Sequence, residues 1–204
     1  MQNSVMKVAI IGAGPRGLWA SEELMERARK RGAAIDVTVF DAKPLEESSA
    51  PGAFRDSVPE EFILNAPKSI VETKLGPLDP NDELPGDFPS RKHVGEHLDK
   101  SWCALEKNLP PRCSLTHRVE NIEMVEPTDS GVDVLGEHFD EVLMVTGHAH
   151  DWPGSLAHAD LGDLKVVAPA YPASNLDAVG PDDVALVRGA ALTFIDVVKY
   201  ADAK

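Results

Sequence analysis

The chain has 204 residues, 43% hydrophobic and 26% charged, a composition typical of a globular protein with one sizeable core. Its net charge of −14 repels nucleic-acid phosphates and anionic membrane surfaces, so we expect neither as a partner. No apolar run is long enough to span a bilayer, and the first residues lack the layout of a signal peptide. Cys103 and Cys113 are typical of reduced thiols, so we expect a cytoplasmic protein.

The first elements along the chain have a β–α–β pattern. Apolar residues at 7–11 predict a buried strand, residues 16–31 predict a helix that Gly32 ends, and the β-branched segment 36–41 predicts a second strand. One face of the helix is expected to carry Leu18, Trp19, Leu24 and Met25. This order of elements predicts parallel strands joined by a crossover helix.

Three glycines lie where the first strand meets the helix, in the spacing G-x-G-x-x-G. Such a turn presents backbone N–H groups and the positive end of the helix to a pyrophosphate, and its second glycine leaves room for that group. We therefore predict dinucleotide binding by Gly12, Ala13, Gly14, Pro15, Arg16 and Gly17. Two alternatives stay open: the glycines could form only a packing turn, and Arg16 could be a solvated helix residue.

Asp41 ends the second strand, where its carboxylate could accept hydrogen bonds from a ribose diol. The same charge would repel a ribose 2′-phosphate, which disfavours NADP at this first site. The nearby Lys43 weakens that argument. The alternative is that Asp41 only caps the following turn.

The remaining chain predicts an insertion and a second group of strands. Residues 42–90 are rich in proline and predict a long irregular loop, interrupted by an apolar segment at 62–64 and followed by a helix at 91–109. The buried stripe of that helix is expected to contain Val94, Leu98, Trp102 and Leu105.

Beyond that helix, turn signals separate predicted antiparallel strands at 119–125, 131–135 and 139–146, and the last one is expected to enter the main sheet. Further strands are predicted at 166–168 and 184–188, with a final helix at 193–200. We therefore expect one domain at 1–165 with an insertion at 42–113, and the start of a second, incomplete strand–turn–helix unit at 166–204.

Four segments together resemble the FAD/NAD(P)-binding domain of the urate-hydroxylase-like flavoprotein family: VAIIGAGPRGLWA, the VFD that ends the second strand, ILNAP and DEVLMVTGH. That family is itself similar to the flavin-dependent hydroxylases and N-monooxygenases. The resemblance implies an α/β, Rossmann-like FAD/NAD(P)-binding fold with a parallel sheet, an inserted helix-containing loop region and an antiparallel β-meander. It implies FAD, with its ADP half at Gly12, Gly14, Gly17 and Asp41, and NAD(P)H as a possible second cofactor.

The resemblance adds three residues to the cofactor site. Thr146 and Gly147, at the end of a sheet strand, would close on the cofactor. Asn65 could bond the flavin ring or its ribityl chain, and forming a turn is its equal alternative. A second glycine turn begins at Gly189, but the methyl group of Ala191 would crowd a second pyrophosphate, which favours a packing turn.

Histidines offer a weaker signal. His93 and His97 have the spacing of metal ligands on a helix, but no third ligand accompanies them, so we expect a solvated face and no metal. His148 and His150 could lie beside the cofactor or at the surface.

Two functions stay open from the sequence. The first is an NAD(P)H-dependent flavoprotein monooxygenase or hydroxylase that acts on a small molecule, with no identifiable catalytic acid or base. The second is a truncated or accessory dinucleotide-binding module without catalysis of its own. The intact glycine turn favours the first function, and the greater length typical of the family favours the second.

Overall fold

The computed structural model describes residues 5–44, 54, 58–147, 160–167 and 169–203. The described residues form two compact units. The first contains those within Met1–Pro51, Glu72–Gly76 and His97–Gly147, and the second contains those within Gly52–Val71, Pro77–Glu96 and His148–Lys204. The expected boundary between residues 165 and 166 stays a prediction.

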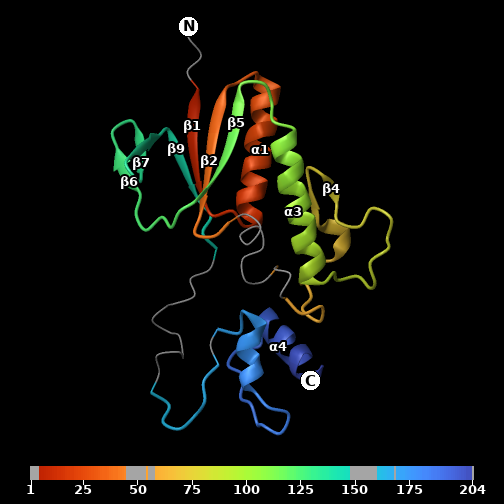
Figure 1. Cartoon of the computed structure of the whole chain (residues 1–204). Coiled ribbons are helices and arrows are strands. Elements are labelled where there is room, and N and C mark those ends of the chain that lie inside the picture. Colours follow the sequence, from red (N-terminus) through yellow and green to blue (C-terminus); the bar gives the residue numbers. More distant parts are fainter. Residues whose placement is uncertain (1–4, 45–53, 55–57, 148–159, 168, 204) are drawn as a thin grey trace. The chain divides into compact units, whose positions relative to one another are not determined.

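The first unit is built on a parallel sheet of four strands in the order β5–β2–β1–β9 (Figure 1). These strands are β1 (Met6–Ile11), β2 (Ile35–Asp41), β5 (Cys113–Val119) and β9 (Glu141–Met144). In the register of the central strand, Val8 of β1 lies opposite Val37 of β2 and Glu141 of β9. Because the strands are parallel, their carboxyl ends meet at one edge, where ligands bind in sheets of this kind.

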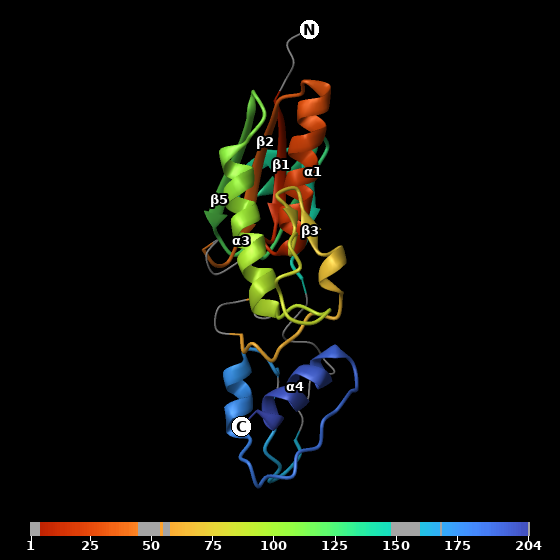
Figure 2. The ribbon, with the colours of Figure 1, turned by 90° about the vertical axis from the view of Figure 1, so that its right-hand side faces the viewer.

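Two helices cover one face of this sheet, α1 (Pro15–Arg31) and the part of α3 (Arg91–Lys107) that begins at His97 (Figures 1 and 2). Both helices confirm the predicted elements, and Gly32 ends α1 as expected. Trp19 differs from the prediction: it is 47% exposed, and the buried Ser21 and Glu22 face the core beside Leu18 and Met25 instead.

A β-meander covers the other face of the sheet (Figure 1). Its antiparallel strands are β6 (Glu126–Thr128), β7 (Gly131–Val134) and β8 (Glu137–Phe139). The core between the meander and the main sheet consists of Ala9, Ile11, Phe40, Val132, Val134 and Phe139. The rings of Phe40 and Phe139 meet edge to face, with centroids 5.9 Å apart. The parallel sheet, the helices and the meander confirm the predicted fold class.

One strand of the first unit lies earlier than predicted. The strand expected at 119–125 is wrong, because β5 ends at Val119 and residues 120–125 have no regular structure. β5 is an edge strand whose polar side chains alternate with partly buried ones, so it lacks the continuous apolar run of a central strand. The last segment does enter the main sheet as predicted, as β9 beside β1.

The second unit contains shorter elements. They are the 3-10 helices η1 (Lys68–Ile70) and η3 (Ala173–Ala178) and the helix α4 (Leu192–Asp202), which confirms the helix predicted at 193–200. The small sheet of β3 (Glu72–Thr73) and β4 (Gly76–Pro77), which belongs to the first unit except for Pro77, lies between η1 and α3 in the chain. A core around Phe62 and Leu176 holds the unit together.

A buried ion pair joins α3 to α4 in that unit. Nε and Nη2 of Arg91 both lie 3.1 Å from Oδ2 of Asp196, and the Tyr171 hydroxyl donates to the same oxygen. Burial, together with the hydrogen bond to Asp196, raises the pKa of Tyr171 to about 12. These contacts satisfy a carboxylate that is only 1% exposed, as a buried charge requires.

The strands predicted at 166–168 and 184–188 are wrong for every residue that the structure describes there. Val184 and Leu186 are fully exposed, and no described strand lies beside them to supply hydrogen bonds.

Within the described ranges, no helix combines the length and the apolar character needed to cross a membrane.

Candidate cofactor site

Two of the three glycines in the turn between β1 and α1 are required by the fold itself. Gly12 has a φ of +114°, and a Cβ there would lie 2.5 Å from the Val145 carbonyl oxygen. A Cβ on Gly17 would lie 2.1 Å from the Gly12 carbonyl oxygen. These contacts bring the ends of β1 and β9 and the first turn of α1 together without side chains between them.

The backbone conformation of Gly14, in contrast, does not require a glycine. It is the N-cap of α1, with φ −67° and ψ −172°, an extended conformation that any residue adopts. No side chain caps the helix there, and the first turn carries no acidic residue that would compensate its positive end. A glycine at this position therefore fits a close approach by an anionic ligand, as the sequence predicts.

Asp41 reaches back to the same turn. The Ala13 N–H donates to its Oδ2 (2.9 Å), and the Lys43 N–H donates to its Oδ1 (3.1 Å). The second bond is the turn cap that the sequence left as an alternative. Each carboxylate oxygen can accept one more hydrogen bond, so the capping role and the binding of a ribose diol are compatible.

A cavity of about 170 Å³ opens beside this turn. It is lined by Ile11, Gly12, Phe40, Asp41, Ala42, Glu120, Asn121, Ile122 and Thr146. The structure thus brings together three predicted site residues, Gly12, Asp41 and Thr146, at the carboxyl ends of β1, β2 and β9. The donors and acceptors around it fit the adenosine half of a dinucleotide.

The segment 120–122 was missed because the preceding strand was placed too late. The Glu120 N–H donates to the Asp41 carbonyl oxygen (2.9 Å), so β5 delivers this segment directly to the end of β2. A strand assigned at 113–119 would have identified it, since residues that follow parallel strands meet at one edge.

The other predicted residues are distributed as follows. Pro15 begins α1, and Arg16 is exposed on its first turn, which leaves both of its alternatives open. Gly147 follows β9 with a φ of +81°, and a Cβ there would contact nothing within 4 Å. Asn65 belongs to the second unit, so its contact with a flavin stays a prediction. His148 and His150 lie outside the described residues.

The structure also adds a residue that the sequence suggested only as core. Trp102 of α3 is 1% exposed, and its Nε1–H donates to the Ala13 carbonyl oxygen (3.3 Å). Its ring meets His117 of β5 edge to face, with centroids 4.7 Å apart. Burial lowers the pKa of His117, and the nearby Glu106 carboxylate opposes that shift.

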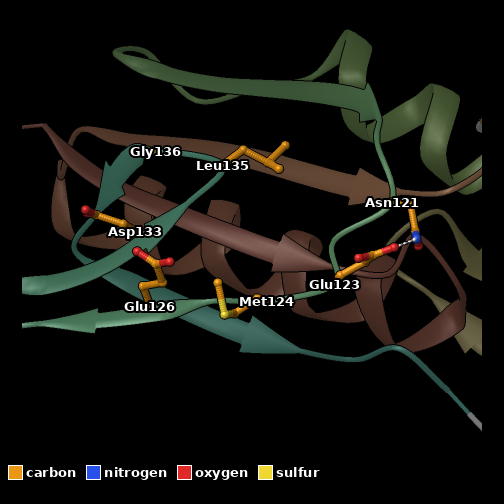
Figure 3. A pocket seen from close by; sticks show the side chains of 7 residues that line it. All are labelled: Asn121, Glu123, Met124, Glu126, Asp133, Leu135 and Gly136. Carbon is orange, nitrogen blue, oxygen red and sulfur yellow. Dashed lines mark hydrogen bonds between the residues drawn. The ribbon is translucent and has the colours of Figure 1, made fainter.

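A larger cavity of about 310 Å³ lies along the meander. It is lined by Asn121, Glu123, Met124, Glu126, Asp133, Leu135 and Gly136, with Asn121 hydrogen-bonded to Glu123 (Figure 3). Three carboxylates in this lining make it unsuitable for a pyrophosphate. The smaller cavity at the glycine turn is therefore the better candidate for the cofactor site.

The prediction that His93 and His97 lie on a solvated face is wrong for His97. His97 is buried, and its Nε2 lies 3.3 Å from Oγ1 of Thr73. His93 is partly exposed, and its Nδ1 lies 2.9 Å from Oγ of Ser90. Among the residues that the structure describes, no three potential ligands gather around a possible metal position.

Comparison with known proteins supports a FAD/NAD(P)-binding fold. A family model described as FAD-NAD(P)-binding matches residues 9–149, which include the glycine turn, Asp41 and the end of β9. The chain is 25% identical over 231 residues to nitrosuccinic acid synthase npaA of Aspergillus oryzae, an alignment that covers 93% of this chain and 34% of that protein. It is also 25% identical over 249 residues to an L-aspartate N-monooxygenase (nitrosuccinate-forming) of Streptomyces cremeus, covering 94% of this chain and 36% of that protein. The chain therefore spans about a third of the length of the curated relatives that it matches.

Proposed function

The chain belongs to the FAD-NAD(P)-binding family, and on that premise we propose that its glycine turn binds the ADP half of FAD in an NAD(P)H-dependent flavoprotein oxidoreductase of the monooxygenase type. The observation that carries the proposal is Gly14. Its backbone conformation admits any residue, yet it stands at an uncapped helix start where a pyrophosphate would need space.

Asp41 supports the adenosine half of this assignment. Its two oxygens are each held by one backbone N–H, which orients the carboxylate at the rim of the cavity. The free acceptor positions suit the two hydroxyl groups of a ribose. A ribose 2′-phosphate would meet the charges of Asp41 and Glu120, so FAD suits this site better than NADP.

FAD, when bound, supplies the redox chemistry that amino-acid side chains lack. The residues of this chain bind and orient it: the amides at the start of α1 receive the pyrophosphate, and Asp41 receives the ribose. The buried faces of β1 and β2 form a rigid support behind both contacts, because Ile10, Ile11 and Phe40 are at most 4% exposed.

The names of the two relatives support a proposal for the substrate class. One is named as an L-aspartate N-monooxygenase and the other as a nitrosuccinic acid synthase. We therefore propose a small molecule with a primary amine as the substrate of the oxidoreductase to which this chain contributes.

The variant Gly14→Ala tests the binding site. We expect its affinity for FAD to fall at least about tenfold, because the added methyl group would occupy the space of the pyrophosphate. Its thermal stability should be equal to or above that of the wild type, since the backbone at Gly14 accepts alanine. Titration of the 204-residue chain with FAD, followed by flavin fluorescence, measures the affinity.

Unchanged FAD affinity in Gly14→Ala, or no FAD binding by the wild type, would refute the proposal. Anaerobic addition of NADH or NADPH to the FAD complex then separates the two functions. Loss of the visible absorbance of oxidised flavin supports an oxidoreductase, whereas a flavin that stays oxidised supports a binding module without turnover of its own.

A further inference from the structure

We propose that Trp102 is a positioning residue for the cofactor, because its indole holds the Ala13–Gly14 peptide in the orientation that presents the Gly14 amide to the pyrophosphate. This inference rests on the proposed function and adds to it a residue far from the glycine turn in sequence. Trp102 lies on α3, a helix that belongs to the long insertion between β2 and β5.

The two peptides that flank Ala13 are each held by one hydrogen bond. The Ala13 N–H donates to Asp41 (2.9 Å), and its carbonyl oxygen accepts from Nε1 of Trp102 (3.3 Å). Ala13 is 1% exposed, so water cannot replace either partner without opening the core. A turn with both polar groups of one residue fixed has little freedom to rotate its next peptide.

The direction of the Gly14 amide follows from peptide geometry. The carbonyl of Ala13 and the N–H of Gly14 belong to one trans peptide, so they point in opposite directions. Fixing the carbonyl on Trp102 therefore aims the Gly14 N–H away from α3. Within the described part of the chain, this N–H donates to no acceptor, which leaves it available to a ligand.

The surroundings of Trp102 allow it to act as a rigid donor. Its side chain is 1% exposed, and the ring of His117 packs edge to face against it. The two peptides that meet at Ala13 are thus oriented by different elements, the Gly12–Ala13 peptide by β2 through Asp41 and the Ala13–Gly14 peptide by α3 through Trp102. Asp41 would also bind the ribose, whereas Trp102 acts only through the peptide.

The variant Trp102→Phe removes the N–H donor and keeps an aromatic ring in the core. We expect its affinity for FAD and for ADP to fall about five- to tenfold, because the Gly14 amide loses its fixed direction. Its affinity for adenosine, which has no pyrophosphate, should stay within about twofold. Competition against FAD fluorescence measures all three ligands on the 204-residue chain.

Trp19→Phe is the matched control, because Trp19 is 47% exposed on α1. It should leave the affinities for FAD and ADP unchanged. If Trp102→Phe does not fold, 3-benzothienylalanine at position 102 removes the donor while keeping the shape of the indole. The Gly14 amide resonance should shift in either Trp102 variant and stay in place in Trp19→Phe.

The outcomes separate this inference from the proposed function. Unchanged ADP affinity in both Trp102 variants overturns the positioning role, and so do equal losses for ADP and adenosine, which indicate packing alone. If wild-type protein binds neither FAD nor ADP, the proposed function fails and this inference fails with it. If Gly14→Ala loses FAD while Trp102→Phe keeps it, only the inference is refuted.

Discussion

At the scale of single residues, Asp41 has a structural role and a proposed binding role. Its carboxylate accepts one N–H from the glycine turn and one from Lys43, so it links the end of β2 to the start of α1. A full negative charge makes both hydrogen bonds stronger than those of a neutral acceptor. In the proposed site, the same charge would disfavour a ribose that carries a 2′-phosphate.

The variant Asp41→Asn tests that charge. We expect the affinity for 5′-ADP to fall about tenfold, because charge-assisted bonds to the ribose become neutral ones. The affinity for 2′,5′-ADP relative to 5′-ADP should rise, because the repulsion of the 2′-phosphate disappears. Isothermal titration measures both ligands.

Asp36→Asn provides the control for that measurement. Asp36 lies on the same strand and accepts a hydrogen bond from the Ser114 hydroxyl (2.6 Å), away from the glycine turn. It should change neither affinity. Equal preferences for the two nucleotides in Asp41→Asn and the wild type would reduce Asp41 to a turn cap.

At the scale of elements, the close contact between β1 and α1 requires that residue 17 is a glycine, without a side chain. A Cβ on Gly17 would lie 2.1 Å from the Gly12 carbonyl oxygen, which is backbone and cannot rotate away. Leu18 follows it directly and is fully buried, so α1 cannot tilt outward without exposing apolar surface.

Gly17→Ala should therefore destabilise the protein by about 1–3 kcal/mol, as overpacking does in tight cores. The sign of the change in unfolding free energy is informative, because alanine in an unhindered helix is more favourable than glycine by about 1 kcal/mol. Unfolding by urea measures the difference. An increase in stability would contradict the close packing of α1 on β1.

At the scale of the whole molecule, buried histidines link stability to pH. His97 and His117 both lie in the first unit, and burial lowers the pKa of each below its ordinary value of 6.5. A hydrogen bond from the imidazole to the Gly76 backbone opposes the lowering of the His97 pKa, and the charge of Lys100 adds to it. Glu106 opposes the shift at His117.

Because these folded-state pKa values are lowered, the unfolded chain binds more protons below about pH 6.5, and stability falls as the pH decreases from about 6.5 toward 5. His117→Phe should reduce that loss, since it removes one of the two imidazoles and keeps a ring against Trp102. Thermal unfolding across this pH range measures both proteins. The same slope in variant and wild type would show that His117 does not titrate in this way.

The net charge of −14 also concerns the molecule as a whole. Such a charge disfavours any long-range attraction of an anionic cofactor. The proposed binding of the cofactor therefore depends on local groups, namely the amides at the start of α1. Substitutions near the glycine turn should therefore change the affinity for the cofactor more than substitutions of surface charges elsewhere.

Local rules of the sequence were sufficient for the first β–α–β unit and much of its site. Glycine spacing, apolar periodicity and the position of Asp41 each depend on residues close along the chain, and the predicted turn, helix and strand all formed. Gly12 and Gly17 are explained by the fold, whereas the backbone of Gly14 admits any residue, so a glycine there is consistent with a ligand. The predicted cofactor contacts themselves stay predictions.

The tertiary structure alone decided the contributions that come from distant segments. β5 is an edge strand whose alternating polar residues give no apolar run by which a sheet strand is predicted. Without that strand, the sequence does not indicate that residues 120–122 line the cavity. The exposed segment 184–188 has the composition of a strand and no described neighbour to pair with. The apolar periodicity of its helix predicts that Trp102 is a core residue, because periodicity indicates only which side chains are buried. Its hydrogen bond to Ala13, 89 residues away in sequence, depends on how α3 packs against the glycine turn.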